Sequence, residues 1–357
     1  MARRIGVVFG GRSVEHKVSL VSARTVARGL AAAGYEVCPL GIAEDGCWVP
    51  KAQAEAALAG QLDRLAPLGL APLATLRELI ESGVDGIFPI VHGTWGEDGT
   101  LQGLCEMADL PYVGPGVLAS SVAFDKAACK RVLAAVGVPV VDWELVERAD
   151  LADEAKLLER LDRLPLPCFV KPSAGGSSVG VTKVKRREDF LAALRHALAF
   201  DDLALVEKGI VGRELECAVL GHRQIEASGV GEIVPGKEFY DYADKYLEDG
   251  AQLILGAKLA PATRNAIRAT AVRAFAAIGG AGLARVDFLM DQDGFYLNEI
   301  NTLPGFTAIS MYPKLWEEAG IPLPQLIDRL VAIAFERHHE RRELDASIKS
   351  WIRSLST

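Results

Sequence analysis

The sequence predicts an α/β protein, and two observations support that class. The first third of the 357-residue chain alternates β-branched apolar runs with stretches of helical period. Glycine-bearing loops, 10–15 and 92–99, follow two of the apolar runs. A β–α–β order implies a parallel sheet flanked by helices, and ligands of such sheets bind beyond the carboxyl ends of the strands. Both loops are therefore candidate binding loops.

The elements of the first third follow in order from this alternation. The expected strands are 5–9, 37–42 and 86–91, and the expected helices are 18–33, 75–82 and one behind loop 92–99.

The remainder mixes longer strands with helices. The elements expected next are strands 143–147, 168–171, 181–184 and 203–207 with helices 126–135, 152–161 and 187–198, then strands 214–220 and 223–228, helix 261–278, hairpin strands 283–290 and 295–300, and helix 324–343. The charged run 336–345 is expected to be a solvated face.

Composition bounds the class of protein. With 39 Lys and Arg against 47 Asp and Glu, the formal net charge is −8, and 50% of the residues are hydrophobic. That content excludes a disordered chain, and no uncharged stretch reaches the roughly 18 residues of a membrane helix. An acidic chain has no general attraction for nucleic acid, although a local basic groove remains open. At roughly 100–200 residues per domain, the length corresponds to two or three domains.

The N-terminus and the cysteines favour a cytoplasmic protein. Arg3 and Arg4 are compatible with a twin-arginine export signal, but the apolar run behind them is only Ile5–Phe9, so we expect a first strand. The cysteines form no Cys-x-x-Cys pair, and most have apolar neighbours. We therefore expect reduced core thiols rather than disulfides or a zinc site.

The strongest chemical signal is a group of oxygen-bearing side chains on one predicted hairpin. Glu299 and Asn301 lie two residues apart on a strand, so their side chains point to the same face, and Asp287 on the preceding strand can lie opposite them. Two carboxylates and an amide oxygen suit Mg²⁺, which shares its shell with phosphates. The alternative is a polar face open to solvent, but large apolar neighbours on both strands favour the metal site.

A second signal is a small-residue loop, 172–180, which follows Lys171 at the end of a predicted strand. Its glycines and serines let backbone N–H groups approach a phosphate, and the lysine adds positive charge. It is not a Walker A loop, because Val181 stands where the lysine is needed. No G-x-G-x-x-G follows the first strand either. A flexible linker is the alternative, which the flanking strands disfavour.

Three weaker signals complete the set. Glu207, followed by Lys208–Ile210 and then Glu214, is compatible with a domain hinge that binds adenine through a carboxylate and backbone groups. Glu15 lies at the mouth of a helix, where an acidic residue by default compensates the helix dipole. The stretch 239–246 holds three tyrosines and a lysine without a regular period. This stretch is compatible with a mobile lid over a phosphate site and equally with an exposed aromatic patch.

Taken in order, these residues resemble the ATP-grasp ligases, and more closely the D-alanine–D-alanine ligase family. The resemblance runs from about Ile5 to about Arg329, and the motifs in order are far more specific than any one alone. The motifs that carry it are Lys126, Lys171 with its loop, Glu207, Glu214 and the set Asp287, Glu299 and Asn301, together with segments 10–20, 92–99, 239–246 and 301–307.

The resemblance implies a three-domain ATP-grasp fold. An N-terminal parallel α/β domain that binds substrate (1–124) is followed by two α+β domains that sandwich ATP, a central subdomain (125–212) and a C-terminal catalytic domain (213–357). Residues 44–73 match the family motifs least well and resemble a variable insertion.

It also implies a reaction. ATP phosphorylates the carboxylate of one D-alanine, and the amine of a second attacks the acyl phosphate. A tetrahedral intermediate then expels phosphate and leaves the dipeptide used in peptidoglycan. The implied setting is the bacterial cytoplasm, and the implied assembly is a homodimer with no nucleic-acid or membrane partner.

The resemblance implies a nucleotide and metal site. It assigns Lys126 and Lys171 to the phosphates of ATP, and Lys245 to the transferred phosphate. It assigns Glu207 and the backbone at Ile210 to adenine, and Glu214 to the ribose. Ser177, Ser178 and Lys208 are assigned to the same nucleotide site. The residues it assigns to two Mg²⁺ or Mn²⁺ ions are Asp287, Glu299 and Asn301. An activating K⁺ is also compatible with the family.

The D-alanine subsites follow from the same resemblance. It assigns Glu15 to the ammonium group of the first D-alanine, in one hydrogen-bonded set with Ser177 and Tyr246, and it places His92 beside the reacting carboxylate. It assigns Arg285 and the N–H of Gly305 to the oxyanion, and Ser310 to the carboxylate of the second D-alanine. An oxyanion donor contributes on the order of 3 kcal/mol. Because acyl phosphates hydrolyse, the site must exclude water, which gives 239–246 a reason to close.

Three alternatives remain. A ligase using D-lactate or D-serine is the nearest, and Tyr246 favours D-alanine because relatives that make the ester usually depart from tyrosine there. A non-catalytic nucleotide-binding regulator need not keep the metal ligands and lysines. A nicotinamide dehydrogenase is suggested only by the early β–α–β order, and the missing G-x-G-x-x-G argues against it.

Overall fold

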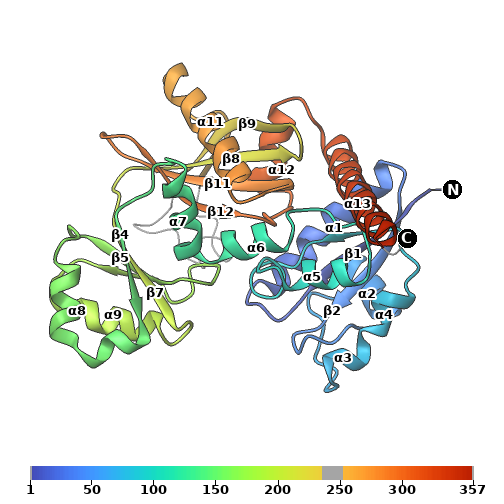
Figure 1. The fold of residues 1–357 in the computed structure, drawn as a ribbon, viewed down its shortest axis with the longest axis horizontal. Helices are drawn as coiled ribbons and strands as arrows, with labels where there is room; N and C mark the ends of the chain where they lie inside the picture. Colours follow the sequence, from blue (N-terminus) through green and yellow to red (C-terminus); the bar gives the residue numbers. More distant parts are fainter. Residues whose placement is uncertain (1, 235–251, 356–357) are drawn as a thin grey trace.

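The computed structural model describes residues 2–234 and 252–355, which form three sheets with helices packed around them (Figure 1). The predicted segment 239–246, with Lys245 and Tyr246, lies outside the described residues. None of the described helices is long and apolar enough to cross a membrane. All six cysteines are buried and free, which confirms the expected reduced core thiols.

The N-terminal sheet is parallel, as predicted, with strand order β2–β1–β3. Its β-branched strands are buried because helices cover the sheet, and α1 packs against β1. The elements of this region are β1 (Arg4–Gly10), α1 (His16–Ala32), β2 (Glu36–Ile42), α2 (Lys51–Leu58), α3 (Pro72–Thr75), α4 (Arg77–Glu81), β3 (Gly86–Pro89), α5 (Thr100–Met107) and α6 (Val117–Phe124). Helix 75–82 is thus split into α3 and α4, and α2 and α6 were not expected.

Segment 44–73, which matches the family motifs least, is built into the first domain. Val49 and Leu65 are buried in the same core as β1 and α1. His16 donates from Nδ1 to the carbonyl of Gly11 (2.7 Å) and accepts at Nε2 from the N–H of Leu65 (3.0 Å). The segment is therefore fixed to the loop that precedes α1.

The central sheet is antiparallel, with order β4–β7–β5–β6. Leucine and alanine side chains of α8 and α9 form one core with the sheet. The elements here are α7 (Lys126–Ala135), β4 (Trp143–Glu147), α8 (Glu154–Leu161), β5 (Cys168–Pro172), β6 (Thr182–Val184), α9 (Phe190–Ala197) and β7 (Leu203–Lys208). Their positions agree with the expected elements to within a few residues.

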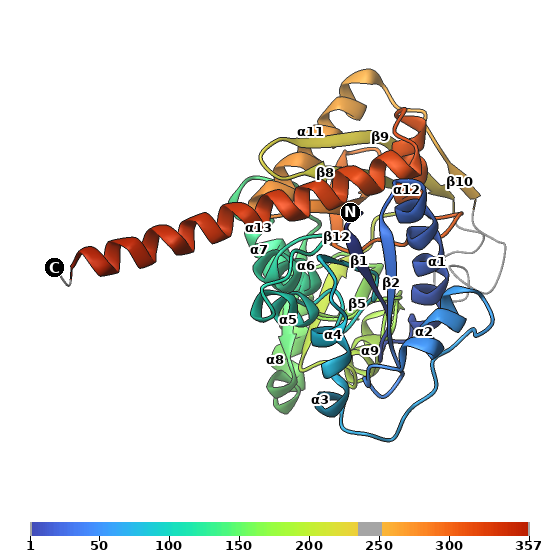
Figure 2. The same cartoon turned by 90° about the vertical axis from the view of Figure 1, so that its right-hand side faces the viewer.

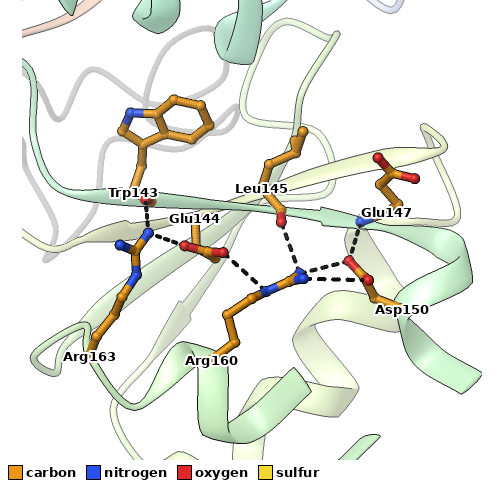
Figure 3. A network of polar contacts seen from close by, with 7 residues as sticks. All are labelled: Trp143, Glu144, Leu145, Glu147, Asp150, Arg160 and Arg163. Atoms are coloured by element: carbon orange, nitrogen blue, oxygen red, sulfur yellow. Dashed lines mark hydrogen bonds and ion pairs between the residues drawn. The ribbon is translucent and has the colours of Figure 1, made fainter. Parts of the chain in front are cut away.

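An exposed polar network ties α8 and the residues after it to β4 (Figure 3). Arg160 forms ion pairs with Glu144 (3.0 Å) and Asp150 (2.7 Å). Arg163 pairs with the same Glu144 and donates to the carbonyl of Trp143 (2.9 Å). None of the members of this network is a predicted site residue.

The C-terminal sheet is antiparallel, with order β10–β9–β8–β11–β12. Strand β8 alternates: Leu215 and Val219 pack in one core with α11, whereas Ala218 and Leu220 pack in another with α12. The elements are β8 (Arg213–Gly221), β9 (Ile225–Val234), β10 (Gln252–Ile254), α11 (Pro261–Ala277), β11 (Gly282–Met290), β12 (Phe295–Asn301), α12 (Met311–Glu318) and α13 (Leu323–Ser354). The hairpin β11–β12 was predicted, whereas α12 and β10 were not.

Helix α13 is eleven residues longer at its C-terminal end than expected and projects from the body (Figure 2). The expectation that 336–345 is a solvated face is wrong for several of its residues. Arg337 is half-buried and donates to the carbonyl of Tyr112 (3.1 Å), and Glu340 accepts from His222 (3.0 Å) and Arg223 (2.9 Å). The charged run therefore ties the first domain to the C-terminal sheet.

Candidate active site

Helix α1, the loop after β3 and the segment after β12 meet at the buried imidazole of His92. Its Nδ1 donates to the carbonyl of Leu303 (3.0 Å), which leaves Nε2 to accept from the hydroxyl of Ser22 (3.1 Å). Ser22 in turn accepts from the N–H of Phe306 (3.3 Å). Burial lowers the pKa of His92, so the ring is neutral. The loop after β3 is thus fixed to the segment after β12.

Glu97 reinforces this junction, although no sequence signal singled it out. Its carboxyl group accepts from the N–H of Gly93 (2.7 Å) and the N–H of Leu303 (3.0 Å). Burial, and next the charge of Glu15, raise the pKa of Glu97 to about 8. In the sequence it is one polar residue of a glycine-rich loop, and only the fold shows that it is enclosed.

Glu15 lies where the first domain meets the small-residue loop. It is the residue directly before α1, and its side chain makes no capping hydrogen bond to that helix. A Cβ built on Gly93 would lie 3.1 Å from Oε2 of Glu15, and one built on Gly176 would lie 3.3 Å from the same atom. These two glycines leave room for the carboxylate to lie between their loops.

The small-residue loop has an unusual backbone at its two serines. Ser177 and Ser178 have φ of 51° and 58°, the left-handed region that non-glycine residues rarely adopt. The hydroxyl of Ser177 is buried and has no hydrogen-bond partner within residues 2–234 and 252–355. Lys126 donates to the carbonyl of Gly175 (2.7 Å), which brings one predicted phosphate lysine to this loop.

Lys171 belongs to a buried group that we call the lysine cluster: Lys130, Lys171 and Glu207. Oε1 of Glu207 lies 2.9 Å from the Nζ of Lys130, and Oε2 lies 2.5 Å from the Nζ of Lys171. Burial alone would raise the pKa of Glu207, but the two lysines outweigh it and lower the pKa to about 2. Lys130 was not predicted as a site residue, because one lysine in a helix gives no signal of its own.

The predicted metal ligands lie in what we call the carboxylate row. Asp287 on β11 pairs in register with Glu216 on β8 and with Glu299 on β12, and Arg285 pairs with Asn301. The same-face placement of Glu299 and Asn301 opposite Asp287 therefore holds. Glu216 was not predicted, although it is the buried one of the two acidic residues in strand β8.

Arg285 offsets part of the charge of this row. Its Nε and a terminal nitrogen donate to Oδ1 (2.8 Å) and Oδ2 (2.7 Å) of Asp287, and its Nε lies 3.1 Å from Oε1 of Glu216. Asn301 donates to Oδ2 of Asp287 (2.9 Å). Burial alone would lower the pKa of Arg285, but Asp287 and Glu216 outweigh it and raise the pKa. Asp287 is thus hydrogen-bonded on both of its oxygens.

The row can be tested for its fit to a divalent cation. No group of three or more His, Cys, Asp or Glu side chains in the described parts of the chain is arranged to hold a metal ion. The predicted set has two carboxylates and an amide, and Oδ2 of Asp287 already accepts hydrogen bonds from Arg285 and Asn301. The oxygen donors and the excess negative charge are nevertheless those that Mg²⁺ takes.

The segment after β12 brings the last two predicted substrate residues together. Ser310 accepts from the N–H of Thr307 (2.9 Å), and the two hydroxyls lie 2.8 Å apart. A Cβ on Gly305 would lie 2.8 Å from Oγ of Ser310, so a glycine is needed there. The N–H of Gly305 and the hydroxyl of Ser310 therefore belong to one compact turn before α12.

The remaining predicted residues lie at the crossing from β7 to β8. Lys208 ends β7, Ile210 lies in the connection and Glu214 is the second residue of β8. Gly209 donates to the carbonyl of Pro167 (2.7 Å), which fixes the connection to the central sheet. The adenine and ribose roles of these residues stay predictions.

The family models described as D-ala D-ala ligase N-terminus and D-ala D-ala ligase C-terminus match residues 4–115 and 132–332. A D-alanine–D-alanine ligase of Thermoanaerobacter sp. (strain X514) is 42% identical over 352 residues, which cover 95% of this chain and 98% of the relative. One from Mycolicibacterium smegmatis is 45% identical over 360 residues, which cover 94% and 96%.

The chain belongs to the D-alanine–D-alanine ligase family. The D-alanine–D-alanine ligase of Coxiella burnetii superposes with a TM-score of 0.84 at 37% identity, covering 99% of both chains. The VanG D-Ala:D-Ser ligase of Enterococcus faecalis has a TM-score of 0.80 at 32% identity, covering 94% of this chain and 100% of that one. These likenesses confirm the α/β class and the ATP-grasp type of fold. The division into 1–124, 125–212 and 213–357 stays a prediction.

Proposed function

We propose that this chain is an ATP-dependent ligase that joins two D-alanines to D-alanyl-D-alanine and releases ADP and phosphate. The observation that carries the proposal is the position of Glu15 between Gly93 and Gly176. An amino acid whose ammonium group binds that carboxylate has its own carboxylate beside a loop suited to phosphate. Phosphorylation of that carboxylate then creates the leaving group that an amide-forming reaction needs.

The other side chains of the ligase have roles that fit this reaction. Arg285 and the N–H of Gly305 stabilise the oxyanion of the tetrahedral intermediate, and Ser310 binds the second carboxylate. His92, which is neutral, lies beside the reacting carboxylate and donates no positive charge to it. The phosphates are held by Lys126 and Lys171, with Lys245 on the transferred group.

Asp287, Glu299 and Asn301 would hold two Mg²⁺ or Mn²⁺ ions, which supply positive charge at the transferred phosphate. Removing Mg²⁺ with a chelator is expected to stop turnover, and an added K⁺ is expected to raise it. The cytoplasm of a bacterium is the expected location and a homodimer the expected assembly, without a nucleic-acid or membrane partner.

A phosphate-release assay tests the substrate assignment. We expect release with ATP, Mg²⁺ and D-alanine, and a product with the mass of the dipeptide, but none with L-alanine. The panel includes D-serine and D-lactate, because the similarity to a D-Ala:D-Ser ligase keeps that alternative in view. Release with another acid, and none above background with D-alanine, would show that the substrate is different.

The Tyr246→Phe variant tests selectivity. Because the amine competitor is protonated at low pH, we expect this variant to shift there from D-alanine toward D-lactate as second substrate. An unchanged ratio of the two products contradicts a role for the hydroxyl.

A further inference from the structure

The lysine cluster holds more positive than negative charge. Lys130 is 1% exposed, Glu207 4% and Lys171 8%, so two ammonium groups and one carboxylate are removed from water together. The pKa of Glu207 is lowered to about 2, so its carboxylate is ionised at neutral pH. A buried net charge is costly unless a counter-ion completes the group. The cluster therefore has the charge that an anionic ligand would complete.

Lys171 is the member of the cluster that a ligand can reach. It is the most exposed of the three, and it lies near the end of β5, directly before the small-residue loop 172–180. Lys130 is too deeply buried to contact a ligand itself. Any effect of Lys130 on a ligand must therefore pass through Glu207.

Strand pairing sets Glu207 and Lys171 on one face of the central sheet. Phe169 on β5 lies opposite Glu207 on β7, and Lys171 is two residues further along β5. Side chains two residues apart on a strand share a face, and a long side chain reaches its diagonal neighbour on the next strand. Without a third group, the ammonium of Lys171 and the carboxylate of Glu207 would form a neutral ion pair.

Helix α7 brings the third group to this face. Asp125, directly before the helix, accepts from the hydroxyl of Ser173 (2.7 Å), and the N–H of Lys126 donates to the carbonyl of Ser173 (2.9 Å). These contacts fix the start of α7 to the residues that follow β5. Lys130 lies four residues after Lys126 and therefore on the same side of the helix. One helix thus supplies a lysine to the small-residue loop and a lysine to Glu207.

The contact between Lys130 and Glu207 is mainly an attraction of charges. The Nζ of Lys130 and Oε1 of Glu207 lie 2.9 Å apart. Neither atom makes a hydrogen bond of ordinary geometry within residues 2–234 and 252–355. Burial raises the pKa of Glu207, and the charge of Lys130 is the largest of the opposing effects that lower it. Lys130 therefore acts on Glu207 through its charge more than by directing the carboxylate.

We infer that Lys130 is a positioning residue, which offsets the charge of Glu207 so that the charge of Lys171 stays available to a phosphate. The inference rests on the proposed nucleotide site and adds to it a residue that does not contact the ligand. Without Lys130, Glu207 and Lys171 form a neutral pair, and the attraction for a phosphate is lost. Adenine is uncharged, so the effect follows the phosphates and not the base.

A series of four proteins separates this role from a purely structural one. The net charge of the cluster is +1 in the unchanged chain, 0 in Lys130→Met, +2 in Glu207→Gln and +1 again in Lys130→Met/Glu207→Gln. If Lys130 acts through charge, the affinity for inorganic tripolyphosphate follows this order. If it serves only the fold, each single variant breaks a buried ion pair, and both weaken binding. The two roles thus predict opposite signs for Glu207→Gln.

Equilibrium binding of tripolyphosphate, ADP and adenosine at a fixed Mg²⁺ concentration and about pH 6.5, well below the ordinary pKa of lysine, tests the inference without turnover. Lys130→Met is expected to weaken tripolyphosphate and ADP by about tenfold or more. Adenosine, which has no phosphate, is expected to change by less than about threefold. Glu207→Gln is expected to tighten tripolyphosphate, and the double variant to come within about threefold of the unchanged chain.

Arg131→Met is the matched control. Arg131 is the next residue of α7, is exposed, and places its guanidinium over the ring of Trp143. The substitution therefore removes one positive charge from the same helix but outside the cluster. Binding of all three ligands is expected to stay within about twofold of the unchanged chain. A loss as large as that in Lys130→Met would mean that the general charge of α7, and not the cluster, sets the affinity.

The outcomes separate this inference from the proposed function. An unchanged chain that binds neither ATP nor ADP contradicts the proposed function itself. The role of Lys130 alone is overturned if Lys130→Met loses ADP and adenosine equally, if it keeps normal tripolyphosphate binding, or if the double variant binds no better than the single one. Should Lys130→Met not fold, Glu207→Gln decides: tighter tripolyphosphate binding supports the inference, and unchanged or weaker binding overturns it.

Discussion

The lysine cluster is a buried group of charges and the carboxylate row is a largely half-buried one, and the two have opposite net signs. In the cluster, two lysines enclose one glutamate, and one of those lysines comes from a helix outside the central sheet. In the row, register places three carboxylates on neighbouring strands, and one arginine lies among them. A positive group suits phosphates and a negative group suits metal ions. The sign of each group follows from which elements supply the neighbours, not from the net charge of −8.

The largest effect on activity is expected for a substitution in the carboxylate row, the negatively charged group. Glu299→Ala removes one carboxylate from the row, and we expect kcat for phosphate release to fall by about a thousandfold or more. Asp293→Ala, in the exposed turn of the same hairpin, is the matched control and is expected to keep full activity. Substantial residual activity in Glu299→Ala would remove this residue from the metal site.

Replacing the arginine tests whether its geometry matters beyond its charge. Arg285→Lys keeps one positive charge in the row but loses the paired hydrogen bonds to Asp287. We expect kcat to fall by about a hundredfold, because one oxyanion donor is also displaced. Arg268→Lys, at an arginine that donates to the backbone carbonyls of Ala227 and Ser228 in β9, is the control. Equal losses in both variants would mean that Arg285 acts only through folding.

The sequence predicts those members of the lysine cluster and the carboxylate row whose neighbours are close in the chain, and it misses those whose neighbours are distant. Asp287, Glu299 and Asn301 were predicted because strand period and a hairpin turn are local properties. Glu216 and Lys130 were not, because their neighbours come from distant parts of the chain. The charged run of α13 was misread for the same reason: Tyr112 and His222, which it contacts, are far away in sequence.

A buried glutamate, Glu207, and a half-buried one, Glu97, sharpen the comparison through pH. The lysines hold the pKa of Glu207 at about 2, whereas burial beside Glu15 raises the pKa of Glu97 to about 8. The ordinary pKa of a glutamate lies between these values, near 4.3. The contribution of Glu207 to stability is thus lost as pH falls from about 4.3 to about 2, and that of Glu97 is lost as pH rises from about 4.3 to about 8.

Glu97→Gln isolates the second of these effects. Between pH 5 and pH 9, we expect the free energy of unfolding of the unchanged chain to fall relative to this variant by on the order of a few kcal/mol. Urea denaturation at each pH measures the difference. Glu317→Gln, an exposed change on α12, is expected to show no such trend. Parallel curves for Glu97→Gln and the unchanged chain would place the pKa of Glu97 in its ordinary range.

The smallest effect on the free energy of unfolding is expected for charged side chains that remain exposed to solvent. Arg163 in the network of Figure 3 is 61% exposed at its side chain, although it forms an ion pair and a hydrogen bond to a backbone carbonyl. Solvent screens such pairs, so Arg163→Ala is expected to change the free energy of unfolding by less than about 1 kcal/mol. Lys130→Met is the buried counterpart, in which removal of one partner is worth several kcal/mol. A loss in Arg163→Ala as large as that in Lys130→Met would show that burial is not what distinguishes the lysine cluster from a surface network.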